Sequence, residues 1–253
     1  MIADVKLSEF PEIMDLLKIL EENGLFKQVD EVSTLVHYVE HMEEKLGEMS
    51  AELRDMHGEV SKIRDGTIKA RCAQLMTKAE ERFTQVKQVV TTCKNNLLIS
   101  ARSAIASFRE KGKDALVSAV NAMRIPAALD AMKNTFTKAA ESMRGNAEKI
   151  DAFREEIHEV GFHLKNAGRA LFGKPAKESE ALKHDKGILA KVRGFMQKTA
   201  DRYEDMGKGA DKLSTKVKEH YEKQKSVKSE LKSLKDAKKA EKVKSVPMKE
   251  KVL

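Results

Sequence analysis

Two short stretches of this 253-residue chain carry residue types at spacings that could do chemistry. Residues 168–174 follow the pattern GxxxxGK, the spacing of a phosphate-binding loop. Such a loop needs Ser or Thr at its eighth position to hold magnesium, and it must follow a strand and open a helix. Here Pro175 occupies the eighth position, and the segment closes a helical pattern. We therefore interpret Gly173 as a helix cap and expect no bound nucleotide or other cofactor.

Residues 37–41 read His-Tyr-Val-Glu-His, the HxxEH spacing of inverted zinc-protease sites. His37 and His41 share one face of a helix, as metal ligation requires. Val39, however, belongs to an apolar stripe, which puts both imidazoles on the solvent side. A hydrolytic zinc also needs a third protein ligand, an open coordination position and a cleft, and the sequence offers no evident source of that cleft. We interpret both as surface histidines, with adventitious metal binding as the alternative, and expect no metal site and no catalytic residue.

The two cysteines, Cys72 and Cys93, form no CxxC motif and are too few for a disulfide framework. Both fall on an apolar series, so we interpret them as buried, inert thiols. The N-terminus lacks the basic start and apolar stretch of a signal peptide. No run approaches the 18 apolar residues of a membrane-spanning helix. Together these features lead us to expect a cytoplasmic protein.

A third candidate site consists of lysines near the C-terminus that could neutralise phosphates of nucleic acid or lipid. The residues are Lys208, Lys212, Lys216, Lys223, Lys235, Lys238, Lys239, Lys242 and Lys244. Acidic residues interleave with them, Arg is scarce, and aromatic residues for base stacking are nearly absent. Our first interpretation is a solvated face. Salt-sensitive contact with a nucleic-acid backbone, and contact with an anionic membrane or an acidic partner, remain as alternatives.

Long helices must position all of these residues. Apolar side chains recur at alternating gaps of three and four residues. This spacing predicts helices that each pack one apolar stripe against a partner helix, as in a coiled coil, and we call such a stripe a seam. The longest seam has one polar member, Asn146, and we refer to it as the long seam. Its residues are Leu129, Met132, Phe136, Ala139, Met143, Asn146, Ile150, Phe153, Ile157, Val160, Leu164, Ala167 and Leu171.

A second seam precedes it and is our candidate pairing seam for a partner helix. Its residues are Leu35, Val39, Met42, Leu46, Met49, Leu53, Met56, Val60 and Ile63. Three of these residues are Met, whose flexible side chains can pack against many surfaces, so the identity of the partner stays open. The spacing does not say whether the seams pair within one chain or across a homodimer.

Breaks and charge divide the chain. We expect a kink or domain boundary at Gly66, a break at Gly112, and another at Ile125-Pro126, because the residue before Pro avoids the helical region. We expect an N-terminal helix plus an acidic coiled-coil arm over 1–65, a helical bundle over 66–173, a long basic helix over 174–234 and a disordered Lys-rich tail over 235–253. The first segment has 7 basic and 16 acidic residues, a net charge of −9, whereas residues 174–253 have 23 and 13, a net charge of +10. These opposite charges could attract each other within or between chains, and the basic part could seek an anionic surface.

Several segments resemble an uncharacterised family of helical proteins carried by clostridial gut bacteria, often within mobile or conjugative elements. The segments are residues 20–25, 38–43, 106–112 and 163–171, which read LEENGL, YVEHME, ASFREKG and HLKNAGRAL. The resemblance covers about residues 15–175 and leaves the basic tail outside. It implies a bacterial, intracellular, mobile-element setting and carries no catalytic residue to this chain.

The fold we expect is all-α and elongated, with long coiled-coil-type helices and a helical bundle in the middle. The function we favour is a non-enzymatic interaction or scaffold protein whose seams recruit helices of a protein partner or of another copy. The alternative is a charge-driven binder of nucleic acid or anionic membrane through the basic C-terminal helix and tail. We expect no small-molecule substrate.

Overall fold

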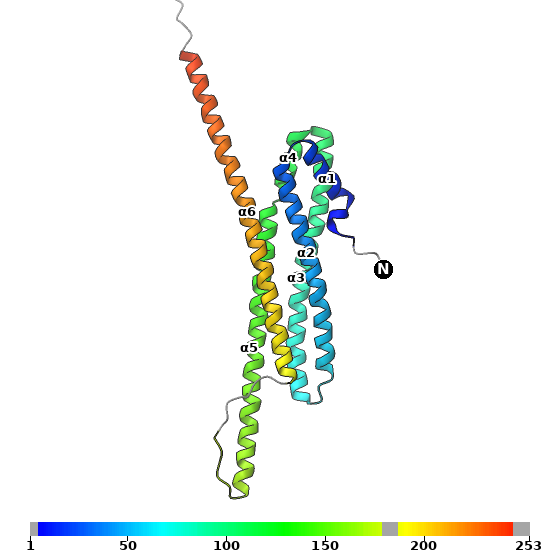
Figure 1. Ribbon diagram of the computed structural model, residues 1–253, viewed down its shortest axis with the longest axis vertical. Coiled ribbons are helices and arrows are strands. Elements are labelled where there is room, and N and C mark those ends of the chain that lie inside the picture. Colours follow the sequence, from blue (N-terminus) through cyan, green and yellow to red (C-terminus); the bar gives the residue numbers. More distant parts are fainter. Residues whose placement is uncertain (1–4, 179–186, 245–253) are drawn as a thin grey trace, which may run out of the picture.

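The structure, a computed structural model, describes the backbone of residues 5–178 and 187–244 and the side chains of residues 5–178 and 187–219. The described residues form helices and no strand, so the expected all-α, elongated fold is confirmed (Figure 1). A short 3-10 helix, η1, precedes the α-helices. The elements are η1 (Leu7–Glu9), α1 (Pro11–Glu22), α2 (Phe26–Ser61), α3 (Gly66–Lys111), α4 (Lys113–Ala122), α5 (Ile125–Leu171) and α6 (Ile188–Lys244).

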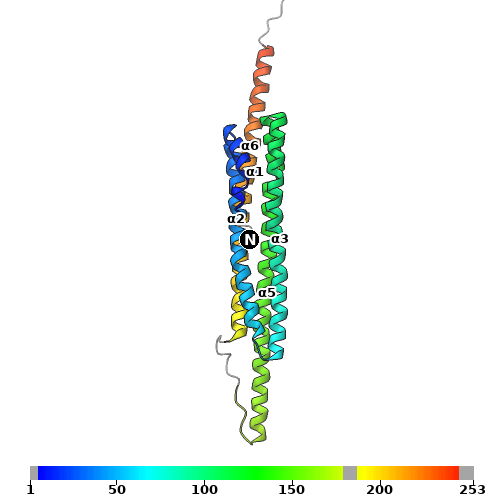
Figure 2. The same cartoon turned by 90° about the vertical axis from the view of Figure 1, so that its right-hand side faces the viewer.

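The four longest helices lie along one axis as two antiparallel hairpins (Figures 1 and 2). α2 runs down and α3 returns beside it, and α5 and α6 form the second hairpin. The α5–α6 pair makes the most extensive contact in the molecule. α4 turns the chain from α3 into α5 at one end of the bundle, and α1 packs on α3 and α2 near the same end.

Local sequence signals set the helix ends. Asp65 caps α3, since its Oδ1 accepts hydrogen bonds from the backbone N–H groups of Thr67 and Ile68 at 2.9 and 3.0 Å. The expected kink or domain boundary at Gly66 is thus a full reversal of the chain. The expected break at Gly112 separates α3 from α4, where the residue has a φ of +76°. The break expected at Ile125-Pro126 falls before Ile125, because both residues belong to the first turn of α5.

The α2 seam lies inside the molecule. Met56 and Ile63 are partly exposed and pack against the core, and the other seven residues of our candidate pairing seam are buried. Asn146 on the long seam is also buried, together with the seam residues on its N-terminal side. The candidate pairing seam therefore packs within the chain and leaves little surface for a second molecule.

The opposite charges of the two ends also meet within the chain. Glu52 on α2 accepts hydrogen bonds from Arg202 and Lys198 on α6, at 2.8 and 3.1 Å. Asp30 and Lys216 form a further α2–α6 pair at 3.1 Å. Such exposed pairs each add little stability, but together they favour α6 lying beside α2.

Helices from the three predicted helical segments, residues 1–65, 66–173 and 174–234, pack in one bundle. The basic helix, expected to end at 234, continues to Lys244. That part of the predicted disordered tail is helical, because Lys, Glu and Ala are good helix formers. The rest of the tail, residues 245–253, lies outside the described residues. None of the described helices is both long enough and apolar enough to cross a membrane.

Candidate helix-docking surface

α5 and α6 are staggered, so one end of α5 extends beyond the bundle (Figure 1). Their ion pairs mark the region of overlap, from Asp130–Lys218 at one end to Asp151–Arg193 at the other, each with an N–O distance of 2.7 Å. Near that second end, the guanidinium of Arg71 on α3 lies 5.9 Å from the ring centre of Phe153. Residues 154–171 continue past these contacts, and we call them the α5 overhang. At 1.5 Å per residue the overhang is about 27 Å long.

The long seam changes from buried to exposed at this point. Ile150 is fully buried, whereas the exposed fractions further along are 38% for Ile157, 67% for Val160, 73% for Leu164 and 86% for Leu171. We call these last four residues the distal stripe. The seven-residue spacing continues, but the neighbouring helices have ended. An unbroken row of exposed large apolar side chains of this kind is typical of an interaction surface.

The described residues that follow α5 leave the distal stripe open. Residues 173–178 run back along the helix, where Asn166 Oδ1 accepts a hydrogen bond from the Lys177 N–H at 3.0 Å. Asn166 Nδ2 donates to the Lys177 carbonyl at 3.1 Å, and Arg169 Nε donates to the Pro175 carbonyl at 2.8 Å. At 100° per residue, positions 166 and 169 lie on the side of the helix opposite the stripe. This anchored segment therefore occupies the polar face of α5.

The candidate lysines differ in their contacts. Lys208 pairs with Glu204 at 2.7 Å and Lys216 with Asp30 at 3.1 Å, so both are engaged within the chain. Lys212 lines a surface groove. The three lie four residues apart on one face of α6, and two of them already have an acidic partner. The side chains of Lys223, Lys235, Lys238, Lys239, Lys242 and Lys244 lie outside the described residues.

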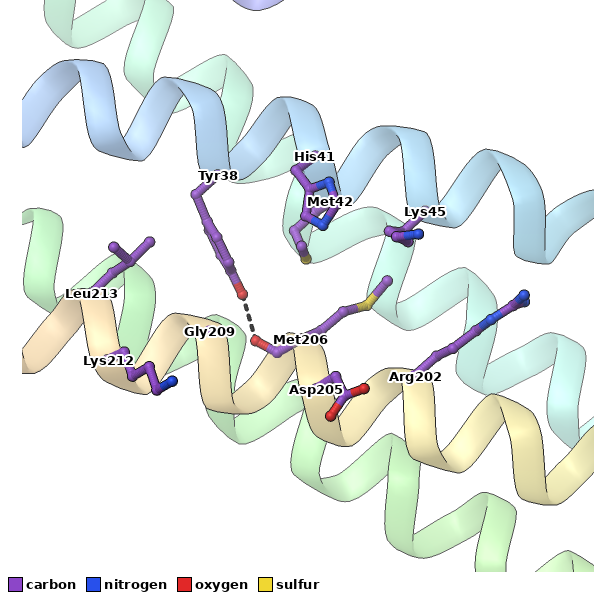
Figure 3. A pocket seen from close by; sticks show the side chains of 10 residues that line it. All are labelled: Tyr38, His41, Met42, Lys45, Arg202, Asp205, Met206, Gly209, Lys212 and Leu213. Carbon is purple, nitrogen blue, oxygen red and sulfur yellow. Dashed lines mark hydrogen bonds between the residues drawn. The ribbon is translucent and has the colours of Figure 1, made fainter.

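That groove runs between α2 and α6 and has a volume of about 480 Å³ (Figure 3). Apolar side chains such as Met42 and Met206 line it, with charged groups at its edge. The Tyr38 hydroxyl group points across it and donates to the Met206 carbonyl at 2.6 Å. A Cβ added at Gly209 would lie 3.1 Å from the Tyr38 ring, so glycine permits this approach. No sequence pattern predicted the groove, because Tyr38 and Gly209 lie far apart in the chain.

The groove holds no evident catalytic pair. Burial raises the pKa of Tyr38, and its proton is engaged by a carbonyl group, so this hydroxyl is a poor nucleophile. His41 lines the groove, and its Nδ1 lies 3.9 Å from Glu44 on its own helix. These groups can bind an apolar side chain or support packing. No acid–base constellation is formed by them.

In the structure, residues of the GxxxxGK and HxxEH motifs cap a helix or lie on its exposed side. Gly173 follows the end of α5 with a φ of +68°, and its N–H donates to the Ala170 carbonyl at 3.0 Å, as a helix cap does. His37 lies on the exposed side of α2, with its Nδ1 3.4 Å from Glu40. Among the described residues, no group of three or more His, Cys, Asp or Glu side chains could hold a metal ion. The thiol of Cys93 is buried, which raises its pKa to about 12.

The fold and these surfaces define an elongated, all-α helical-bundle protein. A family model described as "Family of unknown function (DUF6674)" matches residues 9–252, and the chain belongs to that family. The match includes the basic C-terminal helix, which the resemblance noted in the sequence left outside. Comparison with curated proteins and with solved structures gave no match.

Proposed function

We propose that this chain is a non-enzymatic interaction or scaffold protein that presents the α5 overhang to a partner helix. The observation that carries the proposal is the distal stripe, which continues a buried seam into solvent with Leu164 and Leu171 largely exposed. A partner helix would complete the seam by coiled-coil-type packing, the same use of apolar spacing that the bundle makes internally.

The energetics favour occupation of this surface. Burying a Leu, Ile or Val side chain contributes about 1.5–3 kcal/mol, before the cost of association is subtracted. The overhang also contains Gly161 and Gly168, and each lowers helix stability by about 1 kcal/mol relative to Ala. A helix segment of this length is marginal in water without tertiary packing. A partner would therefore stabilise the overhang while covering its stripe.

The setting belongs to the same proposal. The family resemblance suggests a bacterial, mobile-element context. The free, buried thiols of Cys72 and Cys93 are consistent with a cytoplasmic location. The bundle would act as a rigid base, and the overhang would be the contact element.

Site-specific photo-crosslinking in the source cells tests the proposal. A photoreactive residue replaces Leu164 on the stripe or, as the matched control, Glu155 on the opposite face. We expect a discrete adduct from position 164 with a helix of another polypeptide, and none from position 155. No adduct from position 164, or equal adducts from both positions, would contradict the proposal.

The charge-driven alternative has one observation in its favour, since α6 continues as a helix to Lys244 and carries six of the nine candidate lysines beyond residue 219. Deleting residues 220–253 removes them and leaves the described α5–α6 ion pairs intact. Binding to duplex DNA and to anionic vesicles, measured over a salt series, would fall on deletion if this alternative holds. Unchanged binding, or none at low salt, would exclude it.

A further inference from the structure

The groove between α2 and α6 has the dimensions of a small-ligand site. It lies between two ion pairs that join these helices, Asp30–Lys216 on one side and Glu52–Arg202 on the other. Its volume of about 480 Å³ falls within the range of about 300–1,000 Å³ that is usual for ligand pockets. The lining positions on α6 extend from Arg202 to Leu213, which is about 16 Å along the helix axis. The groove is therefore elongated and suits an extended molecule.

The floor of the groove is apolar. Met42 on α2 and Met206 on α6 line it and are only 3% and 4% exposed, so their side chains form its base (Figure 3). Leu213 and the ring of Tyr38 extend this apolar surface, and Gly209 adds no side chain to it. Methionine side chains are flexible and polarisable, so they can adapt to the shape of an alkyl chain.

One cation at the edge of the groove has no acidic partner. Lys45, Arg202 and His41 each lie near a carboxylate, at distances of 3.5, 2.8 and 3.9 Å. Lys212, in contrast, has no hydrogen bond or ion pair with any residue that the structure describes. Asp205, the acidic residue of the lining, lies seven residues from Lys212, about 10 Å along the axis. The ammonium group of Lys212 is therefore available to an anion.

A molecule that suits both features carries one anionic group and one apolar chain. Its carboxylate would give Lys212 a charge-assisted hydrogen bond, and its chain would cover Met42 and Met206. A fully polar anion would leave the apolar floor in water, and a neutral apolar molecule would leave Lys212 without a partner.

We propose that the groove between α2 and α6 binds a fatty-acid anion, with the carboxylate at Lys212 and the chain along Met206 and Met42. The groove is separate from the α5 overhang, so this inference does not depend on the proposed function.

Titration calorimetry of the full-length protein with octanoate, decanoate and dodecanoate, each below its micelle concentration, tests the apolar floor. Each buried methylene contributes about 0.8 kcal/mol, which is a factor of about four in Kd. We expect affinity to rise with chain length, by up to about 14-fold for each step of two methylenes. No binding of any of the three acids, or an affinity independent of chain length, would overturn the proposal.

Two charge-matched variants test the position of the carboxylate. Lys212→Gln should weaken decanoate binding about tenfold, because the charge-assisted hydrogen bond is lost. Lys208→Gln is the control, since Lys208 lies one turn away on α6, pairs with Glu204 and does not line the groove. This control should leave the affinity unchanged, and both variants should keep the wild-type circular dichroism spectrum. Equal effects of the two substitutions, or no effect of either, would overturn the assigned site.

Discussion

Replacing Tyr38 or Tyr203 by Phe removes one buried hydroxyl group in each case, and we expect opposite effects on stability. The Tyr38 hydroxyl donates to the Met206 carbonyl at 2.6 Å and joins α2 to α6. The Tyr203 hydroxyl is fully buried on α6 and has no hydrogen-bond partner among the described residues. Burial raises the pKa of both tyrosines, so both are neutral at ordinary pH. The two substitutions are equal in shape and differ only in the bond that is lost.

The expected magnitudes follow from these contacts. Tyr38→Phe loses one hydrogen bond, which costs about 1 kcal/mol of unfolding free energy. The Met206 carbonyl keeps its intrahelical partner, so no further polar group is left unsatisfied. Tyr203→Phe removes a buried group whose lack of a partner costs about 1–3 kcal/mol, so this variant should be more stable by about 1 kcal/mol. The two variants should therefore differ by about 2 kcal/mol.

Urea unfolding followed by circular dichroism at 222 nm measures this difference, since the chain has no Trp to report by fluorescence. With a urea m-value near 2 kcal/mol/M, the midpoints of the two variants should lie about 1 M apart, with wild type between them. All samples need one protein concentration, because self-association would add to the apparent stability. Equal shifts in the same direction would refute the assigned hydrogen-bond pattern, and so would an unchanged midpoint for Tyr38→Phe.

Three further predictions follow from the core, the surface charges and the thiols. The side-chain amide nitrogen of Asn146 is buried on the long seam without a partner, so Asn146→Leu should raise the unfolding free energy by about 1–3 kcal/mol; a lower urea midpoint would contradict this. Hydrogen bonds from Lys208 and, second, from Arg144 lower the pKa of Glu204 from its ordinary value of 4.5 to about 2. The stability that this carboxylate contributes is therefore complete above pH 4.5 and is lost as the pH falls towards 2. Thermal melting of wild type and Glu204→Gln between pH 7 and 2 should show a shallower acid decline for the variant, and parallel declines would argue against the assignment. Cys93 should react with a thiol reagent at least about 100-fold more slowly in the native protein than in urea, because it is buried and protonated, and rapid native labelling would exclude that placement.

Helix ends were the most predictable part of this fold, because they depend on residues close in sequence. Gly112 and Gly173 have positive φ values, which their lack of a Cβ allows, and each lies just after the end of a helix. Asp65 caps α3 with its own carboxylate group. These signals require no knowledge of distant residues, so the sequence contains them fully.

Helix pairing was less predictable, because apolar spacing shows that a helix needs a partner without showing which one. The spacing of the α2 seam left open whether it packs within the chain or against another molecule, and in the structure residues such as Leu46 and Leu53 lie in the bundle core. The charge imbalance between the chain ends did indicate an attraction. Only the structure assigns it to contacts within the chain, such as Glu52 with Arg202. The groove at Tyr38 gave no signal, since it depends on one glycine approaching from a distant helix.

The candidate docking surface depends on helix length rather than on residue type. Ile150 and Leu164 belong to the same seam and would be equivalent in any periodicity analysis, but one is fully buried and the other is 73% exposed. The difference arises because α3 and α6 begin near this part of α5, where Arg71 contacts Phe153 and Arg193 contacts Asp151, whereas α5 continues to Leu171. A seam that extends past its neighbours therefore stays exposed in the single chain, and our proposal is that a partner helix covers it. Leu164→Glu therefore separates the two roles of a single seam, since it leaves the bundle packed and removes only the surface that a second helix would cover.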